Sequence, residues 1–195
     1  MSDSHQTKKH KIRRDLLEQR NLLDANVVCD KSVKVQDRLM GMLEYQTGKI
    51  IGSYIPTGME VKTWKVIRHA LANNKTVGLP KIEENNSLSF YSIEEGDLND
   101  NLVESSRFKL KEPKALKSRL IEKVDLLIIP GVAFDTHGYR IGYGFGYYDR
   151  YMARKTYAKS VGLAFDFQIL NHKVPRFSYD WKLDILVSED RTLYC

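Results

Sequence analysis

Residues 124–152 read VDLLIIPGVAFDTHGYRIGYGFGYYDRYM, and this stretch decides the expected fold. Its first part, residues 124–130, is apolar almost without a break, as a strand covered on both faces of a sheet must be. The pattern therefore predicts a strand in the middle of a parallel sheet. Pro130 and Gly131 end the run, and a glycine-rich loop leads into a segment with helical character from about Gly146.

The loop holds four glycines within nine residues, at positions Gly138, Gly142, Gly144 and Gly146. Glycine lets the backbone approach a ligand closely and adopt positive φ, which turns successive N–H groups toward one point. The first turn of a following helix would add further unpaired N–H groups. The loop therefore predicts an anion cradle suited to a polyphosphate, with a glycine-rich structural turn as the alternative. Its spacing differs from both the dinucleotide-binding motif and the P-loop.

Helices and strands alternate along the rest of the chain. Apolar spacing predicts helices from Lys8 to about residue 23, over 32–45, over 60–75 and, shorter, over 114–123, and strands over 49–55, 76–80, 87–93, 160–165 and 183–188. Pro80 is expected to close its strand, and residues 104–113 to be mostly loop. This alternation predicts an α/β fold, a three-layer sandwich with a mostly parallel central sheet flanked by helices. Ligands of such sheets bind at the carboxyl ends of the strands, where the glycine loop begins.

Length predicts one domain, or at most a domain with a small lobe. A single α/β domain over residues 8–195 is expected, preceded by a disordered tail over 1–7. Of the 195 residues, 42% are hydrophobic and 29% charged, enough for a full core. No apolar run approaches a membrane span, and the N-terminus lacks a signal peptide, so a cytoplasmic protein is expected. The two cysteines, Cys29 and Cys195, form neither a disulfide framework nor a metal site. The net charge of +6 is concentrated near the N-terminus and predicts an anionic partner there, nucleic acid or a nucleotide.

The segment PGVAFDTHGYRIGYGFGYYDR, residues 130–150, strongly resembles the signature of the 5-formyltetrahydrofolate cyclo-ligases, also called methenyltetrahydrofolate synthetases. The resemblance continues in KHKIR from Lys9, in YIPTGMEVKT from Tyr54, in LKEP from Leu110 and in DWKLDILVSED from Asp180. The matching segments follow the same order as in the family, and together they span all of the chain except the N-terminal tail. Two departures are a phenylalanine at position 145, where the family has glycine or lysine, and the lack of a Gly-Ile step before Glu-Pro at 112–113.

The resemblance implies an ATP- and Mg²⁺-dependent cyclisation of 5-formyltetrahydrofolate to 5,10-methenyltetrahydrofolate. ATP would phosphorylate the formyl oxygen, N10 would attack the activated carbon, and ADP and phosphate would leave. Phosphate is a far better leaving group than an amide oxygen, so the enzyme would chiefly position and neutralise a transferring phosphoryl group. No membrane partner and no nucleic-acid partner are then expected. The protein is expected to be a monomer.

The resemblance also implies three sets of site residues. The ATP-binding set is Lys9, Arg13, Arg140, Ile141, Gly142, Tyr143, Gly144, Phe145, Gly146, Tyr147 and Tyr148. The folate-binding set is Ile55, Glu60, Tyr143, Gly144, Phe145, Gly146 and Tyr147, with Phe108 near the substrate. The metal set is Asp149 and Asp180, with Asp184 as a rival because DWKLD offers two acids. Mg²⁺ binds through one or two carboxylates plus phosphates and waters, so a complete protein cage is not expected.

Most of these residues also have a purely structural interpretation. Lys9 and Arg13 could form a solvated basic helix face, Arg140 could pair with Asp135, Glu60 and Asp149 could be helix-start acids, and Tyr147 and Tyr148 could be core aromatics. Trp64 is expected in the core, and His137 and His172 at the surface. Two other functions stay open: a catalytically silent relative that binds nucleotide or RNA, and an ATP-dependent enzyme acting on another amide-like substrate.

Overall fold

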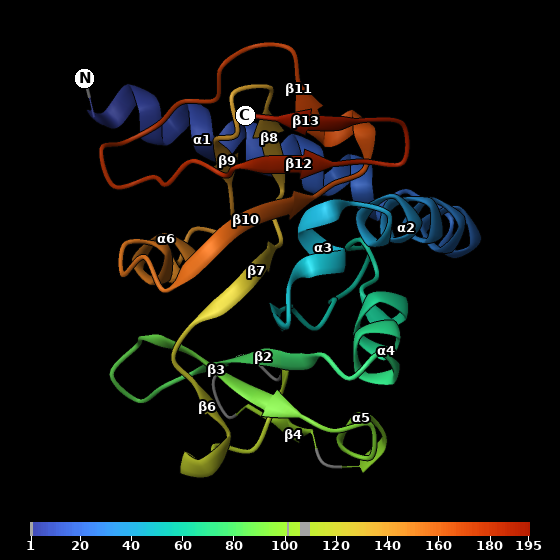
Figure 1. Ribbon diagram of the computed structural model, residues 1–195. Helices are drawn as coiled ribbons and strands as arrows, with labels where there is room; N and C mark the ends of the chain where they lie inside the picture. The colour runs from blue at the N-terminus through green and yellow to red at the C-terminus, as the bar shows by residue number, and fades with distance from the viewer. Residues whose placement is uncertain (1, 101, 106–109) are drawn as a thin grey trace.

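Strand β7 (Val124–Ile129) lies in the middle of an eight-stranded sheet in the computed structural model (Figure 1). The structure describes residues 2–100, 102–105 and 110–195. On either side of β7 run β1 (Ile50–Gly52) and β10 (Tyr157–Leu163), both parallel to it. The prediction of a central parallel strand is therefore confirmed.

The sheet is parallel at its centre and antiparallel at its edges. Its order is β13 (Thr192–Tyr194), β12 (Ile185–Val187), β10, β7, β1, β2 (Thr76–Ile82), β3 (Leu88–Ile93) and β6 (Leu120–Ile121). The strands from β12 to β2 are parallel, while β13, β3 and β6 pair antiparallel. A smaller sheet contains β11 (Ile169–Leu170), β8 (Ala133–Asp135) and β9 (Arg140–Ile141), and β4 (Val103–Glu104) pairs with β5 (Lys111–Glu112).

Helices cover both faces of the large sheet. Figure 1 shows α2 (Ala25–Met40), α3 (Leu43–Thr47) and α4 (Trp64–Ala72) on one side and α6 (Tyr147–Met152) on the other. The long helix α1 (Ser2–Asn21) packs against β8, and α5 (Asp97–Asp100) follows β3. Two 3₁₀ turns, η1 (Lys117–Arg119) and η2 (Asp166–Gln168), complete the chain. The predicted three-layer α/β arrangement is confirmed.

The continuous apolar run of β7 follows from this layering. Leu126 and Ile128 enter the core cluster beneath α2, α3 and α4, whereas Leu127 and Ile129 enter a second cluster that includes Met152 of α6. All four β7 side chains are essentially inaccessible to water. A strand with only one covered face would alternate apolar with polar residues instead.

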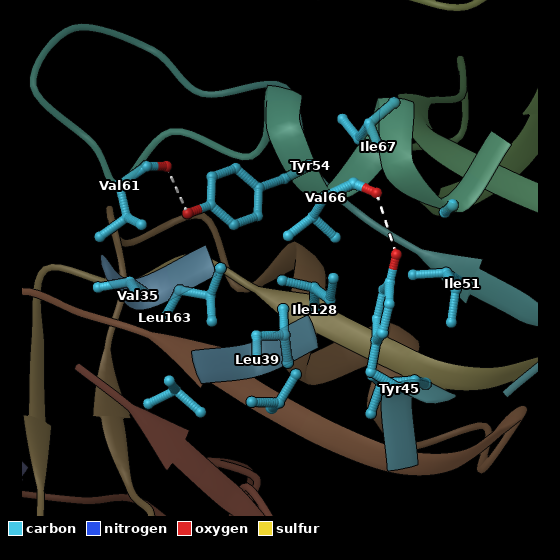
Figure 2. Close-up of a cluster of buried hydrophobic side chains, with 14 of the residues drawn as sticks. Val35, Leu39, Tyr45, Ile51, Tyr54, Val61, Val66, Ile67, Ile128 and Leu163 are labelled. Carbon is cyan, nitrogen blue, oxygen red and sulfur yellow. Dashed lines mark hydrogen bonds between the residues drawn. The ribbon is translucent and has the colours of Figure 1, made fainter. Parts of the chain in front are cut away.

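Two buried tyrosines tie the first core cluster to the backbone (Figure 2). The Tyr45 hydroxyl donates to the Val66 carbonyl at 3.3 Å, and the Tyr54 hydroxyl donates to the Val61 carbonyl at 2.8 Å. Each bond satisfies a polar group that would otherwise be buried without a partner. Trp64 packs against the same cluster, as predicted.

The helix boundaries near the N-terminus differ from the prediction. Helix α1 begins at Ser2, so the expected disordered tail over 1–7 is wrong from Ser2 onward. The helix predicted over 32–45 is two helices, because α2 ends at Met40, with Gly41 as its C-cap, and α3 begins at Leu43. Helix α2 also begins earlier, since the Asp24 side chain accepts a hydrogen bond from Asn26 N at 2.7 Å and caps it.

The strand boundaries differ at Pro80. Strand β2 continues through this proline to Ile82, so the predicted stop is wrong. The last β1 partner of β2 is Gly78, and beyond it β2 pairs only with β3. A residue without an N–H donor is tolerated where a strand has one free side.

Two further segments differ from the prediction. The helix expected over 114–123 is the short turn η1 followed by β6. Of the mostly loop segment expected over 104–113, Glu104 belongs to β4 and Lys111–Glu112 form β5, while 106–109 lie outside the described residues. In the described part of the chain, no helix combines the length and apolar character that crossing a membrane requires.

Candidate active site

A cavity of about 450 Å³ lies at the carboxyl ends of the central strands, where the glycine loop follows β7. Fifteen of the residues predicted for ATP, folate or metal binding line it: Lys9, Arg13, Ile55, Glu60, Arg140, Ile141, Gly142, Tyr143, Gly144, Phe145, Gly146, Tyr147, Tyr148, Asp149 and Asp180. Asp184 does not line it. Phe108 lies outside the described residues. Segments that are far apart in sequence thus meet at one site.

The glycine loop passes from β9 through residues 142–146 into α6. Gly144 has φ +107° and Gly146 φ +67°, backbone conformations that other residues rarely adopt. Helix α1 holds this loop in place, because Arg13 Nε donates to the Gly142 carbonyl at 2.7 Å. Burial lowers the pKa of the Arg13 guanidinium, which remains a cation at physiological pH.

Lys9 and Asp180 form an ion pair between α1 and the segment before β12. The Lys9 ammonium also lies 4.7 Å from the centre of the Phe177 ring, and Phe177 N donates to Asp180 Oδ2 at 2.6 Å. Lys9 is only 7% exposed, so the interpretation as a solvated basic face is wrong for this residue. A buried cation of this kind needs a carboxylate partner, which Asp180 supplies.

Arg140 and Asp149 form a second ion pair, with Nη1 3.1 Å from Oδ1. The same Asp149 oxygen accepts a hydrogen bond from Trp181 N at 3.1 Å. Asp135 is not the partner of Arg140: its carboxylate accepts backbone N–H groups of His137, Tyr139 and Val174 at 3.0 Å each. The alternative that paired Arg140 with Asp135 is therefore wrong. His137 and His172 are exposed, as predicted.

Glu60 is a buried carboxylate, 4% exposed, on the loop before α4. Its Oε2 accepts hydrogen bonds from Thr57 N at 2.8 Å and Thr57 Oγ1 at 3.1 Å, and its Oε1 accepts from the Tyr143 hydroxyl at 2.7 Å. Helix α4 begins only at Trp64, so the predicted helix start at residue 60 is wrong and Glu60 is not a helix-start acid. The carboxylate instead faces the glycine loop across the cavity.

The tyrosines around Glu60 stay protonated at physiological pH. Burial, followed by the Glu60 charge, raises the pKa of Tyr143 to about 12. Burial and then the same charge also raise the pKa of Tyr148 and of Tyr54 well above the ordinary value. Tyr147 and Tyr148 pack against the second core cluster, as the interpretation as core aromatics expects, and they also line the cavity.

Arg20 is a site residue that the motif analysis missed. It is 3% exposed, and its Nη2 donates to the Tyr143 hydroxyl at 2.6 Å. A signal was present in the sequence: Lys9, Arg13 and Arg20 fall at i, i+4 and i+11, which places all three near one face of a helix. Basic residues on a buried helix face indicate anionic or polar partners rather than solvent.

The geometry separates the two candidate metal acids of the C-terminal segment. Asp184 Oδ2 accepts hydrogen bonds from Ser160 N at 2.8 Å and from Ser160 Oγ at 2.7 Å, which joins β10 to the start of β12. Asp180 lines the cavity together with Asp149. By position, Asp180 is the better candidate for a metal ligand, and Asp184 has a structural role.

The residues present fit Mg²⁺. Asp149 Oδ2 and Asp180 Oδ1 accept no hydrogen bond from the described residues, so each acid has one oxygen available for a cation. Among those residues no group of three or more His, Cys, Asp or Glu side chains forms a complete metal cage. Mg²⁺ is commonly held by one or two carboxylates together with substrate phosphates and water, which two cavity acids can provide.

Fold and cavity together define an α/β enzyme with a polar site at the carboxyl edge of a mostly parallel sheet. The model of the 5-formyltetrahydrofolate cyclo-ligase family matches residues 5–189. The chain belongs to this family. It is therefore a ligase with a folate-related function, and the predicted family and enzyme class are confirmed.

Named relatives are similar to this protein over nearly the whole chain. A probable 5-formyltetrahydrofolate cyclo-ligase of Schizosaccharomyces pombe is 25% identical, over 95% of this chain and 97% of the relative. The 5-formyltetrahydrofolate cyclo-ligase of Haemophilus influenzae is 29% identical, over 92% and 97%. The solved structure of Aquifex aeolicus 5,10-methenyltetrahydrofolate synthetase superposes with a TM-score of 0.81 at 31% identity, over 95% of this chain and 92% of that one.

Proposed function

We propose that the protein cyclises 5-formyltetrahydrofolate to 5,10-methenyltetrahydrofolate with consumption of ATP and a requirement for Mg²⁺. The formyl oxygen takes the γ-phosphoryl group and ADP leaves. N10 then attacks the formyl carbon and loses its proton, and phosphate departs with the former formyl oxygen. One observation carries the proposal: a single cavity brings together the glycine loop, the three predicted phosphate-binding cations, the two predicted metal acids and the buried carboxylate of Glu60.

The cations and the loop would bind the triphosphate. Lys9, Arg13 and Arg140 all line the cavity, and Arg13 is already bonded to the loop backbone at Gly142. Guanidinium groups bind phosphate oxygens through paired N–H donors, and positioned cations stabilise the charge that develops during phosphoryl transfer. The basic N-terminal helix thus has a specific use in this proposal.

Asp149 and Asp180 would hold the metal ion. Bound there, Mg²⁺ would neutralise phosphate charge during transfer. Each acid is now paired with one of the predicted phosphate-binding cations, Arg140 or Lys9. Binding of the metal–nucleotide complex would exchange these pairs, so that the carboxylates face the metal and the cations face the phosphates.

Glu60 would bind the reduced pterin, whose ring N–H and amino groups are hydrogen-bond donors. A carboxylate can only accept hydrogen bonds, which matches a donor-rich ring edge. Ile55 lines the cavity five residues earlier in the chain and would pack beside the ring. This pocket for the folate adjoins the glycine loop at Tyr143, which donates to Glu60.

A direct assay tests the proposal. Purified protein is mixed with 5-formyltetrahydrofolate and Mg-ATP, and formation of the methenyl product is followed by its absorbance. We expect turnover with wild-type protein and loss of most of it in Arg140→Ala. Asp37→Asn breaks an exposed ion pair with Lys65, neither of which lines the cavity, and is the matched control.

The other outcomes separate the alternative functions. ATP hydrolysis dependent on a different amide would point to another substrate. Salt-sensitive RNA binding without ATP turnover would support a catalytically silent binder. A cytoplasmic location and a single-domain monomer stay predictions.

A further inference from the structure

Arg20 is a buried charge that the predicted ATP, folate and metal sets do not use. Its side chain donates two hydrogen bonds: Nη2 donates to the Tyr143 hydroxyl at 2.6 Å, and Nη1 donates to the Gly131 carbonyl at 3.4 Å. No carboxylate forms an ion pair with it in the described part of the chain, and its buried Nε has no hydrogen-bond partner there. Arginine is almost never fully buried without a charged partner, so this placement needs an explanation.

The explanation is a chain of hydrogen bonds from Arg20 through Tyr143 to Glu60. A guanidinium can only donate, so the Tyr143 oxygen must accept from Arg20. A carboxylate can only accept, so the single Tyr143 proton must point to Glu60 Oε1, 2.7 Å away. Both directions are therefore fixed by chemistry. The buried Arg20 guanidinium is therefore linked to the buried Glu60 carboxylate by two hydrogen bonds through the Tyr143 hydroxyl.

This chain fixes the acceptor geometry of Glu60. A carboxylate has about four lone-pair positions. Three are occupied, by Thr57 N, Thr57 Oγ1 and the Tyr143 hydroxyl. Thr57 holds Oε2 from one side and Tyr143 holds Oε1 from the other, so the carboxylate cannot rotate freely. What is left is about one well-directed acceptor position for a ligand donor.

We propose that Arg20 is a positioning residue for the folate substrate. It holds the Tyr143 hydroxyl against Glu60 and so sets the direction in which the carboxylate receives one pterin N–H donor. The inference rests on the proposed function and adds to it a residue that touches neither substrate. Without Arg20, the Tyr143 hydroxyl loses the donor that holds it and is free to turn away from Glu60.

Binding of 5-formyltetrahydrofolate in the absence of ATP, measured by calorimetry, tests this. We expect Arg20→Met and Tyr143→Phe each to weaken the folate Kd by about tenfold, the usual scale for one hydrogen bond to a charged group. The double variant should be no weaker than the weaker single variant, because both changes break one chain. The KM for ATP should change less than the KM for folate, since Arg13 still holds Gly142. Arg14→Met, an exposed arginine on the same helix, is the control.

Several results would overturn the inference. Wild-type folate affinity in Arg20→Met, or losses that multiply in the double variant, would show that Arg20 does not act through Tyr143. If Arg20→Met does not fold, Tyr143→Phe decides alone, and an unchanged folate Kd there removes the proposed chain. A wild-type protein that binds no 5-formyltetrahydrofolate would instead refute the proposed function, and the inference with it.

Discussion

Arg140 Nη1 and Asp149 Oδ1, 3.1 Å apart, join the two ends of the glycine loop. Arg140 precedes the loop in β9 and Asp149 follows it in α6, so the ion pair fixes the base of the loop while residues 142–146 span the cavity wall. A second pair, Lys9 with Asp180, fixes α1 against the C-terminal segment. Both predicted metal acids are thus placed by predicted phosphate-binding cations.

The first prediction separates Asp180 from Asp184. Asp180→Asn should raise the Mg²⁺ concentration for half-maximal activity roughly 10- to 100-fold, because it removes one of the two proposed carboxylate ligands. Asp184→Asn should lower the free energy of unfolding by about 1 kcal/mol through its Ser160 bonds, with no change in Mg²⁺ dependence. Magnesium titrations of turnover and urea unfolding measure the two effects. The reverse pattern would assign the metal to Asp184.

The second prediction concerns the backbone of the glycine loop. Gly144→Ala should destabilise the protein by about 1–3 kcal/mol, because a side chain at φ +107° is strained. Gly142→Ala is the matched comparison, since a Cβ there meets no atom within 4 Å and its φ is ordinary. Urea unfolding of both variants gives the difference. Equal destabilisation would mean that the loop does not depend on the left-handed conformation at position 144.

The third prediction compares two neighbouring arginines of α1. Arg13→Ala should raise the KM for ATP about 10- to 100-fold, because it removes both a cavity cation and the anchor of the Gly142 carbonyl. Arg14→Ala should leave the KM within about twofold, since the Arg14 side chain is 66% exposed and its ion pairs are surface pairs of small energy. Steady-state kinetics with varied ATP checks both. Similar effects of the two variants would indicate a diffuse charge effect instead.

Some features of this protein can be predicted from a short stretch of sequence because the burial and backbone freedom of that stretch produce them. The apolar run of β7 and the glycine loop after it reflect burial on two faces and backbone freedom, which any short window displays. The same reading placed the cavity at the carboxyl end of that strand. Resemblance to a family then supplied the individual site residues, since spacing alone left a structural alternative for most of them.

Other features depend on contacts that no local pattern records. Lys9 meets Asp180 across 171 positions and Arg20 meets Tyr143 across 123, so neither pair has a sequence signature. The tolerance of β2 for Pro80 depends on where β1 ends, which is a property of the neighbouring strand. Asp180 and Asp184 look alike in DWKLD, and it is the hydrogen bond from Ser160 to Asp184 that distinguishes them.

The fourth prediction concerns alkaline stability. Burial raises the pKa of Tyr45 from 10.0 to about 12. Between these two pH values the unfolded chain loses the phenolic proton and the folded one keeps it, so the free energy of unfolding should fall as pH rises from about 10 to 12. Below pH 10 this contribution is fully present. Urea unfolding of wild type and Tyr45→Phe across this window measures it.

The variant itself supplies the contrast for that experiment. Tyr45→Phe should be less stable at pH 8, since it loses bonds to the Val66 carbonyl and to His69. Its stability should nevertheless decline less steeply above pH 10. Parallel curves for the two proteins would show that Tyr45 ionises equally in the folded and unfolded chains. Tyr54 and Tyr148 shift in the same direction, so a residual slope is expected.

The charge balance of the cavity wall has a kinetic consequence. Its ionisable lining comprises four cations (Lys9, Arg13, Lys111 and Arg140) and four acids (Glu60, Glu112, Asp149 and Asp180), which sum to zero. A wall of this kind projects little field beyond a Debye length, so it does not steer anions from a distance. The lining itself should therefore add little to the salt dependence of Mg-ATP association, which the net charge of +6 of the whole chain governs. Discrimination among phosphate compounds should then depend mainly on their dissociation rates.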